Sequence, residues 1–342
     1  MMNDEALESY DYNLPQELIA LNPIIPKNNA KLLVYKRDSN TIIHSNFGNF
    51  FDFIPKDCLI VLNDTKVIKA RIFGYKKSGG KIELLYHNAI DYNTFKVQIR
   101  GKVKSGDEII FSNNFKAIIQ DQNSISENGI RIVKFYKDSK ILDSNQILKI
   151  LDEIGCIPLP PYIKRKSDKS DEKLYQSVFA KNLGAIAAPT ASLHFDNNAF
   201  AKIKSLKHCF VTLHIGAGTF FGVESNNIKN HKMHTESFYI NQDSKEKIDN
   251  SDEILCIGTT ACRCVEYYVR NKKLSGNCDI FINPFNKPIK TKYLLTNFHL
   301  PKSSLIMLVS AFIGREKTLE IYKNAIENKY KFYSYGDGML IL

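Results

Sequence analysis

The pattern of hydrophobic and polar positions changes twice along the chain. Two strand-like apolar runs, KLLVYKR at 31–37 and CLIVL at 58–62, come first. From about 68 to 152, short alternating runs are separated by turn clusters such as Lys77-Ser78-Gly79-Gly80. Regular short strands without a helical period predict a small antiparallel barrel or sandwich in this region.

After residue 152 the pattern alternates between strand and helix. Strands are expected at 210–215, 254–257, 279–282 and 293–296, with a last one after Gly336-Asp337-Gly338. Helices are expected from Thr259 to about Arg270, at 304–313, and over 319–330, where apolar residues recur at near-helical spacing. This alternation predicts an α/β layer architecture. We therefore expect a mixed-sheet α/β domain from 1–67 and 153–342, with a small β domain inserted at 68–152.

Length and composition fit a soluble globular enzyme of two domains, because 342 residues exceed the usual size of a single core. The longest apolar run, 305–313, is shorter than the ~20 residues of a membrane span. The first twelve residues are acidic and lack an apolar core, so no signal peptide is expected. Seven scattered cysteines indicate reduced thiols, and we expect a cytoplasmic monomer without membrane contact.

The formal net charge is +11. Such an excess favours a polyanionic partner through phosphate contacts and release of counterions. A lysine-rich proteome, in which any protein looks basic, explains the charge equally well. Charge alone does not decide between the two.

The stretch from 184 to 223 holds two histidines beside small residues and hydroxyl groups. His194 follows Pro189 and Thr190, and His214 precedes Gly216-Ala217-Gly218-Thr219. Apolar runs that stop at Pro, Gly and Thr are typical of turns where the backbone approaches a ligand. For either histidine alone, a core residue with satisfied hydrogen bonds is the simpler interpretation. Two such turns together favour one shared site, with both imidazoles only partly buried.

Further polar residues cluster where predicted strands end, and in an open α/β sheet such ends meet at one crevice. Thr259 and Thr260 open a helix whose free N–H groups suit an anion. Arg263 in the first turn of that helix opposes the helix dipole unless it faces an anion. The remaining candidates are Asn63, Asp64, Thr65, Glu236, Asn297, His299, Lys302 and Asp337.

No metal or dinucleotide motif is convincing. His231-x-x-His234 with Glu236 has metal-like spacing but lacks a fourth ligand nearby. The segment GAG at 216–218 is not a dinucleotide fingerprint, because Phe stands at 221 where Gly is needed. We expect no metal.

Several motifs resemble one family in a consistent order from about Ser9 to Leu342. They are YDYNLPQELIA, VLNDTKVIKARIFG, GAIAAPTASLHF, VTLHIGAGTF, MHTESF, GTTACR, LLTNFHLPKSSLIMLVSAF and YSYGDGML. They resemble the S-adenosylmethionine:tRNA ribosyltransferase-isomerases of the queuosine pathway. The resemblance implies an α/β domain with an inserted β-barrel. It also implies transfer and isomerisation of the ribosyl group of S-adenosylmethionine onto 7-aminomethyl-7-deazaguanine at the tRNA wobble position. Epoxyqueuosine forms, adenine and methionine leave, and S-adenosylmethionine is the only co-substrate besides this tRNA.

The candidate residues suit this chemistry. A sulfonium acidifies the neighbouring ribose C5′ protons, so a neutral histidine or a carboxylate can remove one. The catalytic candidates are His194, His214, His299 and Asp337. The amino-acid end of the donor needs an anion site and a cation site. Arg263 or Lys302 are the candidates for the first, and Asp337 or Glu236 for the second. The sequence does not order these roles.

Two other functions remain open at this point. An S-adenosylmethionine-dependent RNA methyltransferase would release S-adenosylhomocysteine instead of adenine and methionine. A non-catalytic RNA-binding protein would bind tRNA without turning over the donor, although intact histidines at 194, 214 and 299 argue against it.

The missing metal-ligand set generates a first prediction. Activity survives a strong chelator, because no step depends on a bound divalent ion. The measurement is adenine release before and after exhaustive treatment with the chelator. Complete loss that one particular divalent ion restores would contradict it.

Overall fold

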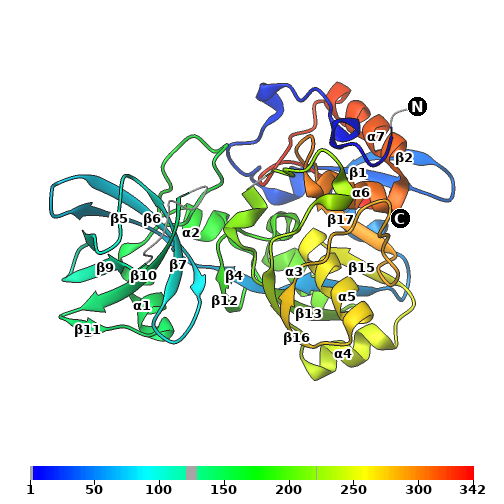
Figure 1. The fold of residues 1–342 in the computed structure, drawn as a ribbon. Helices are drawn as coiled ribbons and strands as arrows, with labels where there is room; N and C mark the ends of the chain where they lie inside the picture. Colours follow the sequence, from blue (N-terminus) through cyan, green and yellow to red (C-terminus); the bar gives the residue numbers. More distant parts are fainter. Residues whose placement is uncertain (1–2, 121–128, 221) are drawn as a thin grey trace. The chain divides into compact units, whose positions relative to one another are not determined.

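The chain forms two units in the computed structural model, which describes residues 3–120, 129–220 and 222–342, and only the backbone at 219 and 220 (Figure 1). The first unit comprises Met1–Lys66, Gln176–Asn182 and Ala188–Leu342. The second comprises Val67–Tyr175 and Leu183–Ala187. The second unit therefore extends beyond the expected insert at 68–152, because residues up to Tyr175 pack with it.

A nine-stranded mixed sheet forms the centre of the first unit, in the order β16-β14-β13-β3-β15-β17-β18-β1-β2. The strands are β1 (Lys31–Lys36), β2 (Thr41–Asn46), β3 (Leu59–Asn63), β13 (His208–Leu213), β14 (Glu236–Tyr239), β15 (Ile254–Ile257), β16 (Ser275–Cys278), β17 (Tyr293–Asn297) and β18 (Gly338–Ile341). The mixed-sheet α/β architecture is thus confirmed.

Four neighbouring strands of this sheet run parallel. β3 pairs in parallel with β13 and β15, and β15 pairs in parallel with β17. Every residue of β3 and β15 is buried, because both faces of the sheet are covered. This explains why the sequence shows continuous apolar runs here instead of alternation. The carboxyl ends of all four strands lie at the same edge of the sheet.

Alternate residues of these strands point to two different layers. On one face, Ile60, Leu62 and Leu255 join a core that includes Phe50 of the 3₁₀ helix η4 (Phe47–Asp52) and Ile203 of α3 (Asn197–Lys204). Helix α5 (Thr259–Asn271) packs against β3, β13, β15 and β17 and buries eight of its thirteen residues. The sheet is therefore a middle layer that fixes the start of α5 at its carboxyl edge.

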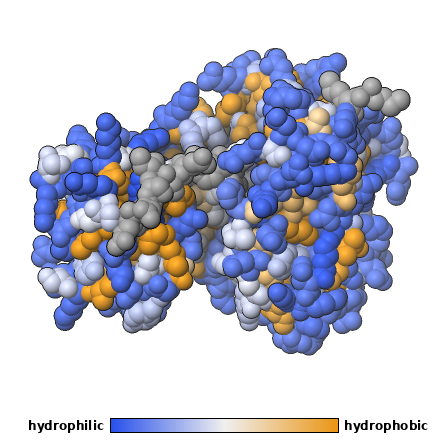
Figure 2. Space-filling model, viewed as in Figure 1, coloured by the Kyte–Doolittle hydropathy of each residue, from blue (hydrophilic) through white to orange (hydrophobic). Residues whose placement is uncertain are grey.

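Helix α6 (Ser304–Ile313) confirms the predicted apolar helix at 304–313. The Ser303 side chain caps it by accepting a hydrogen bond from the Ile306 N–H at 3.3 Å. Gly314, at φ 81°, separates it from α7 (Arg315–Glu327), which packs against it. Within the described ranges no helix has the length and apolarity needed to cross a membrane. Most of the face in Figure 2 is hydrophilic.

The second unit is built on a small antiparallel barrel. Six strands close on themselves in the order β10-β7-β6-β5-β8-β9, because β9 also pairs with β10, and the short β11 pairs antiparallel with the end of β10. Phe95, Phe115 and Phe135 fill the interior from alternating positions. The bounds are β5 (Arg71–Lys76), β6 (Lys81–Ala89), β7 (Phe95–Arg100), β8 (Glu108–Ile110), β9 (Phe115–Ile119), β10 (Ile130–Lys137) and β11 (Lys140–Ile141).

Short elements complete the two units. They are α1 (Ser144–Ile154), α2 (Asp171–Leu174), α4 (Gln242–Asp249), β4 (Thr65–Val67) and β12 (Asn182–Ala185). The capping box of α1 is complete: Asp143 accepts from the Gln146 N–H at 2.9 Å, and Gln146 accepts from the Asp143 N–H at 3.0 Å.

The strand expected at 279–282 is wrong. The strand lies one segment earlier, where Ser275–Cys278 pairs with β14 at the edge of the sheet. The polar sequence SGNC has little strand propensity of its own, so pairing with β14 determines its conformation. Ile280 and Ile282 are buried through packing, which gave them the appearance of a core strand.

Glu266 of α5 provides a stability prediction. Its buried carboxylate accepts hydrogen bonds from the backbone N–H groups of Ile289 (2.9 Å), Lys290 (3.0 Å) and Thr291 (2.7 Å), and it pairs with Arg270. We expect Glu266→Ala to lower the free energy of unfolding by about 3–5 kcal/mol, because three N–H groups and a cation lose their acceptor. Equilibrium urea unfolding measures this. The exposed Glu246→Ala on α4 is the control, and equal midpoints for the two variants would contradict the expectation.

Candidate functional site

The carboxyl edge of the parallel strands carries most of the polar residues selected from the sequence. Asn63 ends β3, His214 follows β13, and Asn297 ends β17. Gly258 follows β15 at φ 91° and begins α5. A methyl group on Gly258 would lie 3.6 Å from Cβ of Ala191, in the 3₁₀ helix η6 (Thr190–His194). The segment with His194 therefore packs against the same edge.

Asn63 joins three of these elements through its side-chain amide. Its Nδ2 donates to the Leu213 carbonyl and to Oγ1 of Thr260, both at 3.0 Å. Its Oδ1 accepts from the backbone N–H groups of Thr65 (3.2 Å) and Leu213 (3.1 Å). The amide is thus fully used by the protein. Asn63 positions the edge rather than offering groups to a ligand.

His214 lies next to a buried carboxylate. Its Nδ1 is 2.7 Å from Oγ1 of Thr65. Asp64 accepts hydrogen bonds from Oγ1 of Thr212 (2.6 Å) and Nδ2 of Asn182 (3.0 Å). Burial lowers the pKa of His214, and the negative charge of Asp64 opposes that shift. The half-buried ring can therefore exchange a proton more readily than a fully buried histidine.

Glu236 and Arg263 form a buried ion pair with each other. Oε1 of Glu236 also accepts the Gly216 N–H at 3.0 Å, and Nε of Arg263 donates to the Ile280 carbonyl at 3.2 Å. The sequence placed these two charges in separate subsites for the donor's ends. The structure instead uses them together to hold the turn at Gly216.

The second glycine of that turn is tightly packed. Gly218 lies in the 3₁₀ helix η7 (Ala217–Phe220), and a methyl group there would lie 2.6 Å from the ring of His234. A side chain at 218 would therefore displace the turn. The neighbouring candidate Thr219 lies in the same helix, but its side chain is outside the described residues.

His194 is held between a ring and an amide. Its imidazole stacks on Phe47 with ring centroids 3.9 Å apart and planes at 12°, and its Nε2 lies 3.3 Å from Oδ1 of Asn297. Only 9% of the residue is exposed. The expectation of a partly buried histidine is wrong for His194, because η6 places the ring under Phe47.

The hydrogen bonds of Asn297 determine the tautomer of His194. Nδ2 of Asn297 donates to the backbone carbonyl of Tyr333 at 2.8 Å, and a carbonyl can only accept. The oxygen of the amide must therefore face His194, so Nε2 of the imidazole carries the hydrogen. No described residue forms a hydrogen bond with Nδ1, which keeps its lone pair.

Burial keeps this ring neutral. It lowers the pKa of His194 to about 3, while the hydrogen bond with Asn297 raises it and the charge of Lys27 lowers it further. The imidazole is therefore uncharged throughout the neutral pH range. Its neutral form leaves the lone pair of Nδ1 free, and burial makes the protonated form costly.

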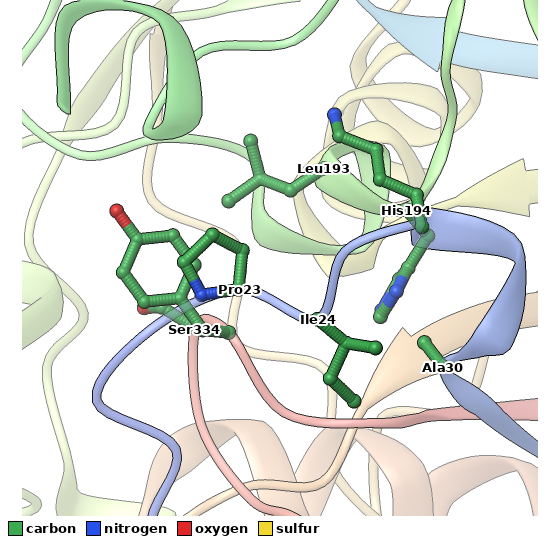
Figure 3. Close-up of a pocket in the computed structure, with 8 residues that line it drawn as sticks. Pro23, Ile24, Ala30, Leu193, His194 and Ser334 are labelled. Atoms are coloured by element: carbon green, nitrogen blue, oxygen red, sulfur yellow. The ribbon is translucent and has the colours of Figure 1, made fainter. Parts of the chain in front are cut away.

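A pocket lies directly beside this ring. Its empty volume, open solvent included, is about 270 Å³. Figure 3 shows Pro23, Ile24, Leu193 and Ser334 gathered around the space next to His194. The lining residues are Pro23, Ile24, Lys27, Ala30, Leu193, His194, Ser334 and Tyr335. The pocket thus combines four apolar residues with an imidazole, an ammonium group and two residues that carry hydroxyl groups.

His299 is a buried histidine with an internal partner. Its Nε2 lies 2.7 Å from Oγ1 of Thr296, and its backbone N–H donates to the Tyr322 hydroxyl at 3.2 Å. Burial lowers its pKa to about 3. Lys302 forms ion pairs with Glu8 (2.7 Å) and Asp11 (3.0 Å). Neither arrangement brings a free group to the pocket.

The carboxylate of Asp337 connects two backbone segments. It accepts the backbone N–H groups of Lys31 (2.7 Å) and Lys331 (2.6 Å), and 1% of the residue is exposed. Burial raises its pKa against the effect of these two donors. The carboxylate ties the start of β1 to the loop before β18. It therefore supports the wall of the pocket rather than lining it.

The remaining candidates lie at turns of the same edge. Pro189 precedes η6, and half-buried Thr190 is its first residue. Thr259 is buried at the first position of α5. No group of three or more metal-ligating side chains occurs in the parts of the chain that the structure describes.

Sequence reasoning missed Lys27, Phe47 and Ser334. Lys27 comes from η3 before β1, Phe47 from η4 after β2, and Ser334 from the loop before β18. Long-range packing brings them to His194, so local spacing carried no signal. The proline pair at 23 and 26 beside Lys27 was the one available hint of a shaped loop.

Comparisons with known proteins cover the whole chain. The family model described as "Queuosine biosynthesis protein" matches residues 7–341. A protein of Aliarcobacter butzleri named S-adenosylmethionine:tRNA ribosyltransferase-isomerase is 52% identical over all of both chains, and one of Campylobacter jejuni with the same name is 55% identical over all of both. A crystal structure of S-adenosylmethionine tRNA ribosyltransferase from Thermotoga maritima is similar with a TM-score of 0.54 and 29% identity, covering 98% of this chain and 100% of that one.

The arrangement of Asp337 generates a prediction that separates a structural role from a catalytic one. Asp337→Asn places an amide NH₂ opposite one of two backbone N–H groups. We therefore expect the free energy of unfolding to fall by about 1–3 kcal/mol. Activity per folded molecule stays unchanged. Thermal melting and an active-site-normalised rate measure the two effects. Asp38→Asn on the exposed turn after β1 is the control; a stable but inactive Asp337→Asn would contradict this role.

Proposed function

The chain belongs to the queuosine biosynthesis protein family, and from that premise we propose that it is an S-adenosylmethionine:tRNA ribosyltransferase-isomerase. It transfers and isomerises the ribosyl group of S-adenosylmethionine onto 7-aminomethyl-7-deazaguanine in tRNA. The product is epoxyqueuosine-tRNA, and adenine and methionine are released. The enzyme acts in the cytoplasm as a monomer and needs no metal.

The observation that carries this proposal is identity above 50% over the full length of relatives with this activity in their names. The same relatives do not support the methyltransferase or the non-catalytic alternative. The neutral imidazole of His194 beside a pocket adds a chemical reason, because the reaction needs a base near the ribose.

His194 is the base in this proposal. Its Nδ1 takes a proton from C5′ of the donor, and the electron pair stays on C5′, where the adjacent sulfonium stabilises it. The ring becomes an imidazolium whose Nε2–H bond to Asn297 gains strength from the charge. Before the transfer, Asn297 keeps the hydrogen on Nε2, so Nδ1 has a free lone pair. After the transfer, the same hydrogen bond stabilises the imidazolium.

His214 has the other proton-transfer role. Adenine leaves with the electron pair of its bond to the ribose, and a proton donor at a ring nitrogen makes that departure easier. Burial lowers the pKa of His214 as it lowers that of His194, but the charge of Asp64 opposes the shift at His214, whereas the charge of Lys27 adds to it at His194. The two histidines therefore differ in the charge beside them, and the carboxylate beside His214 makes it the better candidate for the proton donor.

The test of the proposed function uses S-adenosylmethionine and tRNA that carries 7-aminomethyl-7-deazaguanine. The expected products are adenine, methionine and a tRNA with the mass of the added group. Release of S-adenosylhomocysteine would identify a methyltransferase. Tight tRNA binding by folded protein without any turnover would identify a binding protein.

The histidine roles generate a prediction about turnover. We expect His194→Ala and His214→Ala each to lower single-turnover adenine release by about 10²–10⁴-fold, the usual contribution of a general base or acid. His194→Ala also lowers the melting temperature, because it removes a ring stacked on Phe47. Adenine release and melting are measured on the same samples.

The pH dependence follows from the direction of the pKa shift. The pKa of His194 is lowered from 6.5 to about 3, so the neutral, active ring persists at every pH above about 3. Titration of His194 therefore causes no loss of adenine release by the unliganded enzyme as the pH falls from 7 to 5.

His208→Ala, at a half-exposed histidine on β13, is the control for the two histidine variants. Normal adenine release by folded His194→Ala would refute its role as the base.

A further inference from the structure

Lys27 is the only charged residue among the eight that line the pocket beside His194. It follows Pro26 in the 3₁₀ helix η3 (Lys27–Asn29), just before β1. Its Nζ donates one hydrogen bond to the Phe195 carbonyl at 3.1 Å, next to His194 in the chain. An ammonium group has three hydrogens, so two remain for a ligand in the pocket.

The charges that face this ammonium group are few. Asp196 caps α3 by accepting the Ala199 N–H at 2.8 Å, and its charge favours protonated Lys27. Burial has the opposite and larger effect, and it lowers the pKa of Lys27. His194 is neutral and supplies no negative charge. The half-buried cation therefore lacks a salt-bridge partner within 4 Å among the described residues, and an anion in the pocket would stabilise it.

We propose that Lys27 binds the carboxylate of the methionyl arm of S-adenosylmethionine in this pocket, and so places the donor's sulfonium and C5′ beside Nδ1 of His194. This inference rests on the proposed function. The apolar walls at Pro23, Ile24 and Leu193 match the methylene groups of that arm. Small-molecule sites commonly combine apolar walls with a few placed polar groups.

The covalent structure of the donor connects the two protein groups. The carboxylate and C5′ lie at opposite ends of a short chain that runs through Cα, Cβ, Cγ and the sulfur. A carboxylate bound to Lys27 therefore holds C5′ no further from the ammonium group than the length of this chain. Lys27 acts as a positioning residue for the proton transfer.

The same contact helps His194 to act as a base. The charge of Lys27 disfavours an imidazolium at His194. A bound carboxylate offsets that charge, whereas the sulfonium beside the ring adds a positive charge of its own. The carboxylate therefore removes one of the two positive charges that oppose protonation of His194.

A phosphate of tRNA is the other anion that an ammonium group would attract. The apolar side chains of Pro23, Ile24 and Leu193 beside Lys27 favour the methionyl arm, because they can contact its methylene groups and a phosphate has none. The two occupants differ in which substrate loses affinity when the charge is removed.

The test compares S-adenosylmethionine with its decarboxylated analogue by isothermal titration calorimetry. Wild-type enzyme should bind S-adenosylmethionine about 10- to 100-fold more tightly than the analogue, the usual effect of a charge-assisted hydrogen bond. In Lys27→Met that preference should disappear, and in Lys27→Arg it should largely return. Lys207→Met, on an exposed loop, should behave like wild type.

Each outcome decides the matter. If Lys27→Met keeps the preference for the carboxylate, the inference is overturned. A higher KM for tRNA with unchanged donor affinity would likewise overturn it and assign Lys27 to a phosphate. Failure of wild-type enzyme to release adenine would instead refute the proposed function. Each variant is compared only if its circular dichroism spectrum equals that of wild type.

Discussion

The side-chain amide of Asn297 is the interaction on which the proposed site depends. It ends a central strand, donates to carbonyls of the loop before β18, and presents its oxygen to His194. Because carbonyls accept only, the amide has one orientation and the imidazole one tautomer. A single residue at the end of β17 thus connects the sheet, the C-terminal loop and the proposed base.

The fold supports this amide from several directions. Parallel pairing brings the ends of β13, β3, β15 and β17 to one edge, and Asn297 lies opposite Gly338 in the register of β18. A methyl group on Gly338 would lie 2.6 Å from the ring of Phe47, which stacks on His194. Charged groups elsewhere at the edge, such as Glu236 with Arg263, hold turns. The edge therefore separates groups that fix the backbone from the groups that face the pocket.

Much of the fold follows from local patterns, whereas the roles within the site do not. Continuous apolar runs indicated buried strands at β3 and β15, and the turn-separated runs indicated the barrel. The edge strand β16 was missed because SGNC gains its conformation from pairing with β14. His194, His214 and Asn297 could be selected from the sequence as polar residues at strand ends. Lys27 and Phe47 could not, because only tertiary packing brings them to His194.

The central claim is that the folded protein keeps His194 neutral, with the hydrogen on Nε2 and the lone pair on Nδ1. Nitrogen-15 NMR of protein labelled at histidine side chains tests it most directly, with His194→Gln identifying the resonances. At pH 7 the account predicts a protonated, pyrrole-type signal for Nε2 and an unprotonated, pyridine-type signal for Nδ1. Exchanged signals, or two protonated nitrogens at that pH, would contradict it.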